Sequence, residues 1–224
     1  MKTIRQVLIL TCLVFSFAGE VICAADTTAI TLPVPRLDGS ISVEQALHDR
    51  RSLRSPAVTP LTLAEVGQLC WAAQGVTDAK GHRTAPSAMA LYPLELYVLA
   101  GTVTDLAPGF YHYDPATHSL QLVATGDKRA EFNEQAVGQD WISGAPAIFV
   151  ITGSVGKLTR MKDRGRPYMY VEAGLAAQGF FLQATALGLG STYVGGFSPQ
   201  EARLALGLPE SEEVIGVLPV GHRP

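Results

Sequence analysis

The sequence predicts an α+β fold in which a mixed β-sheet surrounds one long central helix. Strands and helices alternate unevenly along the chain. Phe110–Tyr113 and Leu120–Ala124 flank the turn dipeptide Asp114-Pro115, which is typical of an antiparallel hairpin. Tyr170–Leu187 is apolar nearly all round, the pattern of a helix that is buried. Together these features favour an α+β arrangement.

The elements before the hairpin begin with local signals. Two prolines predict an extended arm over Thr27–Ser40. Ser42–Gln45 and Thr62–Glu65 are capping boxes, in which a hydroxyl and a side chain three residues later satisfy free amides at a helix start. They predict helices that end near Arg50 and near Ala73. The apolar run Leu94–Ala100 predicts a strand.

The elements after the hairpin follow the same logic. Ser198 precedes a proline at the first helical position and predicts a short helix. The others are recognised by their apolar pattern. They are an exposed amphipathic helix over Asp127–Val137, a buried strand over Ala147–Thr152, the long helix over Tyr170–Leu187, a strand over Ser191–Val194 and a last strand over Glu213–Val220.

Composition excludes several classes of protein. The chain has 224 residues, 47% of them hydrophobic and 17% charged, with a formal net charge of −3. Disordered chains are poorer in apolar residues and more highly charged. Nucleic-acid-binding domains usually carry a strongly basic face, so no nucleic-acid partner is expected. The length suits one domain over residues 42–224, preceded by an arm over residues 26–41.

Residues 1–25 are predicted to be a secretory signal peptide. Lys2 and Arg5 precede the apolar run Val7–Ala18, and small residues lead to a cleavage site after Ala25. The run is shorter than the roughly 20 residues that span a membrane. We therefore expect Sec-dependent export, a periplasmic location and no membrane span in the mature chain.

The sequence gives little evidence for a metal site or for a phosphate-binding loop. Cys70 would be the one cysteine left after cleavage, and its apolar neighbours favour core packing. The histidines are scattered singly, so no metal ligands are assigned. Gly153–Lys157 follows a strand as a phosphate loop would, but Ile151 and Leu158 occupy positions that the motif reserves for glycine and for serine or threonine.

A cluster of cations follows the first predicted helix. Arg50, Arg51, Ser52 and Arg54 place three guanidiniums and a hydroxyl within five residues. Guanidiniums match the oxygens of a phosphate, and in an extended chain positions 50, 52 and 54 point to one side. The cluster therefore predicts an anion site, with a solvated basic loop as the alternative.

Several segments resemble the nitroreductase superfamily in their order and spacing. They are His82–Ala88, Leu91–Tyr97, Glu172–Gln178, Gly195–Phe197 and Pro219–Pro224. The likeness extends over residues 43–224. Tyr111–Pro115 is similar to the SagB/ThcOx-type dehydrogenase branch of that superfamily.

The resemblance implies a homodimer that binds FMN at the subunit interface. It assigns the FMN phosphate to the arginine cluster with Arg223, and a contact from the other subunit to Pro86, Ser87 and Ala88. It places the isoalloxazine ring along Gly195, Gly196 and Phe197, where the Gly196 amide is the expected donor toward flavin N5. For Gly195 and Gly196, backbone freedom in a turn is the alternative.

The catalytic residues are less well defined. Ala90 and Tyr92 stand where classical nitroreductases carry Asn and Gln, which favours the dehydrogenase branch. Tyr92 is a candidate pocket residue or a structural tyrosine. Lys162 with Tyr168 or Tyr170 resembles the Lys–Tyr pair of azoline oxidases, unless Lys162 is a solvated loop charge. Glu172 is a contact to the partner subunit or a structural residue.

The resulting prediction is an FMN-dependent oxidoreductase. It would transfer hydride or electron pairs through flavin N5 to or from a small-molecule or peptide substrate. Outside the cytoplasm, oxygen or a quinone-linked redox partner would accept the electrons. The alternatives are a non-catalytic flavin-binding protein of the same fold and an exported anion- or peptide-binding module.

Overall fold

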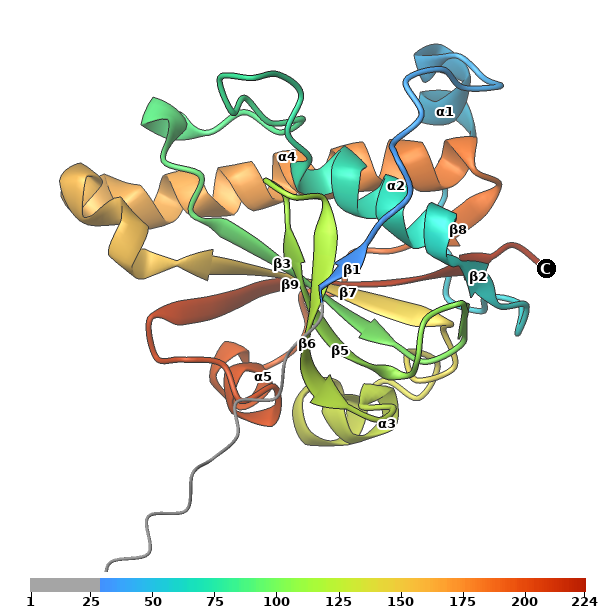
Figure 1. Cartoon of the computed structure of the whole chain (residues 1–224). Coiled ribbons are helices and arrows are strands. Elements are labelled where there is room, and N and C mark those ends of the chain that lie inside the picture. Colours follow the sequence, from blue (N-terminus) through green and yellow to red (C-terminus); the bar gives the residue numbers. More distant parts are fainter. Residues whose placement is uncertain (1–28) are drawn as a thin grey trace, which may run out of the picture.

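The computed structural model describes residues 29–224 and shows one sheet of seven strands crossed by a long helix (Figure 1). The strand order is β1-β6-β5-β3-β7-β9-β8. The strands of this sheet are β1 Ile30–Thr31, β3 Leu94–Ala100, β5 Gly109–Asp114, β6 Ser119–Thr125, β7 Ala147–Ser154, β8 Leu189–Ser191 and β9 Glu212–His222. The α-helices are α1 Val43–Asp49, α2 Leu63–Gln74, α3 Arg129–Phe132, α4 Gly165–Ala186 and α5 Pro199–Ala205.

The predicted α+β class is confirmed, and so is the hairpin. β5 pairs with β6 in antiparallel register, with Tyr113 opposite Leu120. The seven-stranded sheet is not mixed as predicted, because every strand pairing within it is antiparallel. Parallel pairing between strands occurs in a separate small sheet, where β2 (Leu61–Thr62) lies beside β4 (Val103–Thr104).

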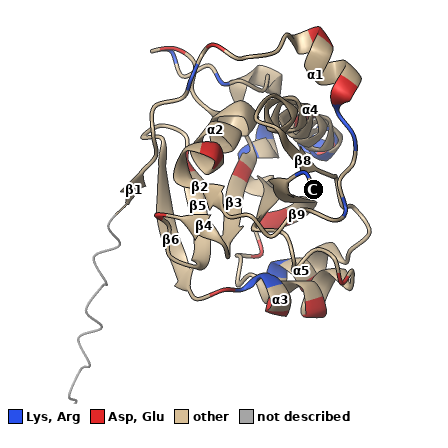
Figure 2. Cartoon of the chain, turned by 90° about the vertical axis from the view of Figure 1, so that its right-hand side faces the viewer, with Lys and Arg blue, Asp and Glu red and all other residues tan. Residues whose placement is uncertain are grey.

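Helices cover both faces of the sheet. Seen from the side (Figure 2), α1, α2 and α4 lie on one face and α3 and α5 on the other. Side chains alternate across a strand, so β3 sends Leu96 and Val98 into the core under α2 and α4, and Tyr97 and Leu99 into the opposite core. In the first core, the ring centroids of Phe149 (β7) and Phe180 (α4) lie 4.8 Å apart. This packing holds α4 across the centre of the sheet.

Two predicted helix starts are confirmed. Thr62 and Glu65 form the reciprocal capping box of α2, and the Ser42 hydroxyl accepts the Gln45 amide at the start of α1. Cys70 is buried inside α2, as predicted, and this burial raises the pKa of its thiol. These local signals are reliable because each depends on a few adjacent residues.

Three elements differ most from the prediction. Helix α4 begins at Gly165 instead of Tyr170, since Pro167 lies in its first turn, where a missing amide proton costs nothing. Strand β8 covers Leu189–Ser191 and so shares only Ser191 with the predicted strand Ser191–Val194, although Val194 keeps a single bridge to Val217. The helix predicted over 127–137 is α3 followed by a π-helical turn over Asn133–Val137. Its apolar side chains are buried in the second core.

The arm packs against the domain from Ile30 onward. β1 pairs with β6, and farther along the Arg36 amide donates to Gln68 Oε1 at 2.8 Å while Gln68 Nε2 donates to the Arg36 carbonyl. The expected signal peptide, residues 1–25, lies outside the described residues. Over residues 29–224, no helix has the length and apolar character needed to cross a membrane.

Candidate functional site

The predicted anion-binding residues converge on one pocket. Arg50, Ser52 and Arg54 line a cavity of about 330 Å³ at the C-terminal end of α1. Its remaining wall is formed by α4 and by the segment that ends β8. These residues are Gln178, Phe181, Ser191, Thr192 and Tyr193, none of which is among the cofactor-binding residues predicted from the sequence. The polar pair Ser191-Thr192, which lies shortly before Gly195-Gly196, is the signal that could have pointed to them.

Residues 50–54, here called the arginine loop, are held in place by strand β8. Ser52 forms a parallel bridge with Ser191, and the Leu53 amide donates to the Ser191 carbonyl at 3.1 Å. Gly190 permits this approach, because a Cβ there would lie 2.7 Å from the Leu53 Cβ. The pocket therefore depends on contact between two segments that lie almost 140 positions apart in the sequence.

We expect Gly190→Ala to push the arginine loop away from β8. The new methyl group would collide with the Leu53 side chain, and overpacking of this kind costs about 1–3 kcal/mol in the free energy of unfolding. Urea denaturation measures this loss. Gly144→Ala is the matched control, because the nearest non-neighbouring atom to its Cβ is a carbonyl oxygen at 3.6 Å. Equal stability of the two variants would show that the loop does not rest on Gly190.

The pocket offers hydrogen-bond donors that the protein does not use. Within residues 29–224, no hydrogen bond or ion pair engages the guanidinium of Arg50 or Arg54. The Ser191 hydroxyl is buried and has no partner among the described residues. A buried polar group without a partner costs about 1–3 kcal/mol, so it is normally satisfied by a ligand or by water. Two cations and an unpaired hydroxyl fit the oxygens of a phosphate.

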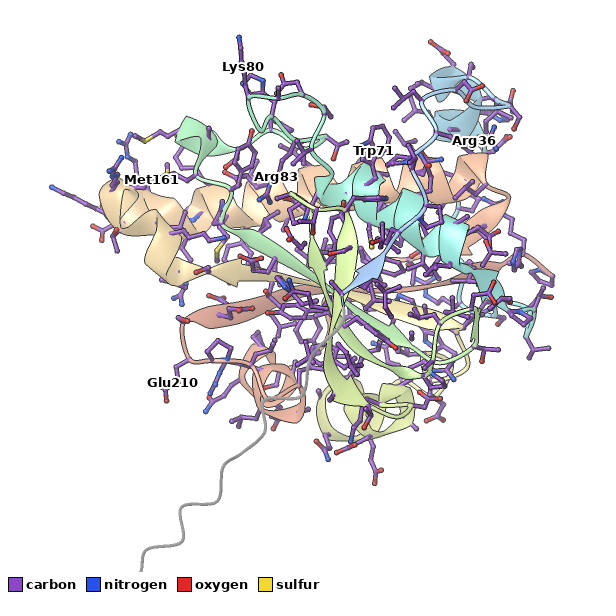
Figure 3. All side chains as sticks on the ribbon, in the orientation of Figure 1. Arg36, Trp71, Lys80, Arg83, Met161 and Glu210 are labelled. Carbon is purple, nitrogen blue, oxygen red and sulfur yellow. The ribbon has the colours of Figure 1, made fainter. Side chains whose placement is uncertain are left out.

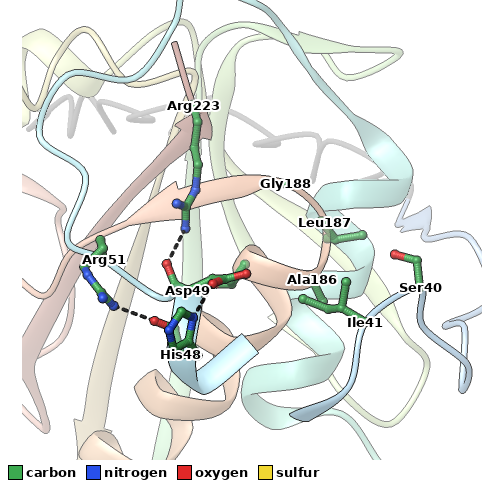
Figure 4. A pocket seen from close by; sticks show the side chains of 10 residues that line it. Ser40, Ile41, His48, Asp49, Arg51, Ala186, Leu187, Gly188 and Arg223 are labelled. Atoms are coloured by element: carbon green, nitrogen blue, oxygen red, sulfur yellow. Dashed lines mark hydrogen bonds and ion pairs between the residues drawn. The ribbon is translucent and has the colours of Figure 1, made fainter. Parts of the chain in front are cut away.

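Arg51 and Arg223 lie elsewhere (Figure 4), along a neighbouring cavity of about 680 Å³. Arg51 Nη1 donates to the carbonyls of His48 and Arg50, at 2.7 Å each. Arg223 donates to the Asp49 carbonyl from Nη2 and to the Leu189 carbonyl from Nε. Cations at a helix C-terminus satisfy its free carbonyls. The structure therefore places these two arginines at the end of α1, and does not bring them into the cavity with Arg50.

The glycines after β8 stand in open surroundings. Neither Gly195 nor Gly196 has a positive φ. A Cβ on Gly196 would meet Gln139 Nε2 at 3.8 Å, and one on Gly195 would meet the Tyr193 ring at 3.5 Å, both ordinary contacts. The chain itself therefore does not require glycine at either position. Phe197 is partly buried and packs against the core beneath α5.

The Ser87–Tyr92 segment has a strained backbone. Met89, Ala90 and Tyr92 have φ values of 56°, 51° and 45°, in the left-handed region that costs a non-glycine residue roughly 1–2 kcal/mol. The Ser87 hydroxyl accepts the Tyr92 amide at 2.8 Å and closes the loop. Pro86 is exposed directly before it. In one chain, this loop lies outside the cavity that Arg50 lines.

The catalytic candidates are dispersed. The Tyr92 ring lies under Arg83, whose guanidinium carbon is 4.7 Å from the ring centroid. Figure 3 shows Arg83 on the side of the sheet that the long helix crosses. Lys162 is exposed, and within the described chain no hydrogen bond joins it to Tyr168 or Tyr170. Tyr168 is exposed, whereas the Tyr170 hydroxyl donates to Glu213, and this bond raises the pKa of Tyr170.

Comparison with known proteins gives a consistent result. The family described as "Nitroreductase family" matches residues 47–222. A protein of Methanocaldococcus jannaschii that is named as a nitroreductase is 38% identical over 199 residues, covering 88% of this chain and 98% of its own. A crystal structure from Ralstonia eutropha, also named as a nitroreductase, is 30% identical with a TM-score of 0.78. That alignment covers 88% of this chain and 90% of the other.

A more distant structure shares the fold alone. The NADPH:FMN oxidoreductase of Vibrio harveyi, solved in complex with NAD⁺, is 22% identical with a TM-score of 0.58. The alignment covers 80% of this chain and 68% of that one.

Proposed function

The chain belongs to the nitroreductase family, whose members are generally flavin-dependent oxidoreductases, and on that premise we propose that it binds FMN and transfers electron pairs through it. The substrate would be a small molecule or a peptide. The observation that carries the proposal is the cavity lined by Arg50, Ser52, Arg54 and Ser191, in which no described residue engages either guanidinium. Two unused guanidiniums and a hydroxyl suit a phosphate monoester such as that of FMN.

The residues of this chain would hold the cofactor in distinct ways. Arg50 and Arg54 would bind its phosphate with charge-assisted hydrogen bonds, and the hydroxyls of Ser52 and Ser191 would complete the shell. The space beside Gly195 and Gly196 suits a flat ring, because no Cβ projects into it. The flavin supplies the electron chemistry once bound, while the protein selects and orients the substrate. Arg51 and Arg223 would act indirectly, by fixing the C-terminal end of α1, which Arg50 directly follows.

We propose further that the protein is a homodimer. The long helix α4 presents an exposed apolar stripe with helical spacing, formed by Tyr168, Val171 and Leu175, which are 42%, 59% and 45% exposed in the single chain. A contiguous apolar stripe of this kind usually marks an interface. The resemblance to the superfamily assigns the Pro86–Ala88 segment of such a second copy to the flavin bound by the first.

The branch of the family to which the protein belongs and its cellular location are also proposals. Ala90 and Tyr92, in place of the Asn and Gln of classical nitroreductases, support a dehydrogenase of the SagB/ThcOx type. The signal-like residues 1–25 support export to the periplasm. Nicotinamide cofactors are scarce there, so the substrate itself would donate electrons, and oxygen or a quinone-linked partner would accept them.

Anaerobic reduction tests the proposed activity. The FMN-loaded protein is mixed with NADH, NADPH and a panel of reduced organic donors, and the visible absorbance of the oxidised flavin is followed. We expect at least one donor to bleach the flavin and an acceptor to restore it over repeated cycles. A protein that holds FMN but turns over with no donor would be a flavin-binding protein without catalysis. A protein that binds phosphate or peptide but no flavin would be a binding module.

A further inference from the structure

One side chain from the long helix supports the strained loop. Glu172 lies in the second turn of α4 and is 5% exposed. Its Oε1 accepts the backbone amide of Ala88 at 2.8 Å, across 84 positions of sequence. Ala88 directly precedes the left-handed residues Met89 and Ala90. The carboxylate therefore holds the end of the loop at which the backbone turns into its strained conformation.

The surroundings of Glu172 leave this amide as its main partner. The neighbouring α4 residues Met169, Ala173 and Ala176 are buried in the apolar core. Among the described residues no ion pair involves Glu172. A buried carboxylate is costly unless it is hydrogen-bonded, and a bond from a backbone amide to a carboxylate is among the stronger ones. An acid at this position is thus explained by the loop that it holds.

A second contact to the same loop is more exposed. Lys157 Nζ lies 3.4 Å from the Tyr92 carbonyl and pairs with Glu95, with its side chain 42% exposed. Contacts made by exposed lysines contribute little because water competes for the charge. Glu172 and Lys157 thus touch opposite ends of one loop with different expected strengths, which provides a matched comparison.

We propose that Glu172 is a positioning residue that fixes the Ser87–Tyr92 loop in the conformation needed at the flavin. The inference rests on the proposed function for the flavin, but its structural half concerns the loop alone. Glu172 also lies six residues before Gln178, roughly 9 Å along the same helix, and Gln178 lines the cavity of Arg50. Helix α4 therefore ties the position of the loop to the position of the anion pocket.

The structural half is tested on the flavin-free protein by amide hydrogen exchange across residues 87–92. Three variants are compared with the wild type: Glu172→Ala, Glu172→Gln and Lys157→Ala. We expect exchange at Ala88 to rise at least about tenfold in Glu172→Ala, the scale of one lost charge-assisted hydrogen bond. Glu172→Gln keeps an acceptor oxygen and Lys157→Ala removes an exposed contact, so both should stay close to the wild type.

The functional half is tested on the FMN-loaded protein. Glu172→Ala should shift the visible flavin spectrum and lower kcat/KM about tenfold, and Glu172→Gln should restore both. Unchanged exchange at Ala88 in Glu172→Ala would overturn the proposal. So would a Glu172→Gln variant as impaired as the alanine one, because the acceptor oxygen that it keeps would then not be what holds the Ala88 amide. If the wild type takes up no FMN, the proposed function fails, while the exchange experiment still decides the role of Glu172.

Discussion

Replacing Gly196 with valine is expected to yield a folded protein that no longer retains FMN. In the single chain a Cβ at Gly196 meets nothing closer than Gln139 Nε2 at 3.8 Å, and its φ is not positive. The substitution should therefore leave the chain stable. The proposed flavin ring would occupy the space beside Gly196, so the two methyl groups of valine would collide with it. We expect FMN affinity to fall at least about a hundredfold, which corresponds to about 2.7 kcal/mol.

Two measurements on one sample distinguish a clash with the flavin ring from a general loss of stability. The thermal midpoint of the flavin-free variant reports the fold, and fluorescence titration with FMN reports the affinity. Gly144→Val is the control, because Gly144 has similarly open surroundings but lies away from the anion cavity. A folded Gly196→Val protein with wild-type FMN affinity would show that the ring does not lie there. A fall in stability that accounts for the lost flavin would mean that the glycine serves the backbone.

Arg50→Ala and Arg54→Ala should each weaken FMN binding about ten- to hundredfold while the fold survives. Each removes a charge-assisted contact to phosphate, which contributes about 1.5–3 kcal/mol. Neither guanidinium is bonded within the described chain, so stability should change little. The affinity of the wild type should also fall as salt is added, because ions screen this attraction.

Arg51→Ala provides the contrast. Its guanidinium already donates to the carbonyls of His48 and Arg50 at the end of α1. Its removal should lower stability by about 0.5–1.5 kcal/mol and reduce FMN affinity less than either neighbouring variant does. Isothermal titration of all three variants makes the comparison. Equal losses in all three would indicate a general charge effect, and no loss in any would return the cluster to a solvated basic loop.

The fold could be predicted where signals are local. The Thr62–Glu65 capping box and the Asp114-Pro115 turn each lie within a few residues, and both appear in the structure. Boundaries that depend on tertiary contacts are harder to predict from the sequence. Ser191–Val194 has the composition of a strand, but the chain leaves the sheet after Ser191, and the Tyr193 hydroxyl bonds instead to the Ile215 carbonyl.

The candidate site could likewise be predicted only where its signals are local in the sequence. The sequence indicated that Arg50, Ser52 and Arg54 converge, since alternate residues of an extended segment share one side. It could not show that Arg223 closes the end of α1, because its contact with the Asp49 carbonyl joins residues 174 positions apart. Nor could it show that Gly190 admits Leu53, or that Glu172 holds Ala88. Each of these depends on which segments the fold brings together.

Titration of the flavin-free protein with FMN and FAD in parallel tests the central claim most directly. We predict that the protein turns yellow with FMN, saturates at one FMN per chain, sediments with the mass of two chains and releases FMN when denatured. FAD should bind more weakly, because the cavity beside Arg50 measures about 330 Å³ and suits a phosphate end better than a second nucleotide. A protein that stays colourless in excess FMN, or that saturates with FAD instead, would contradict the account.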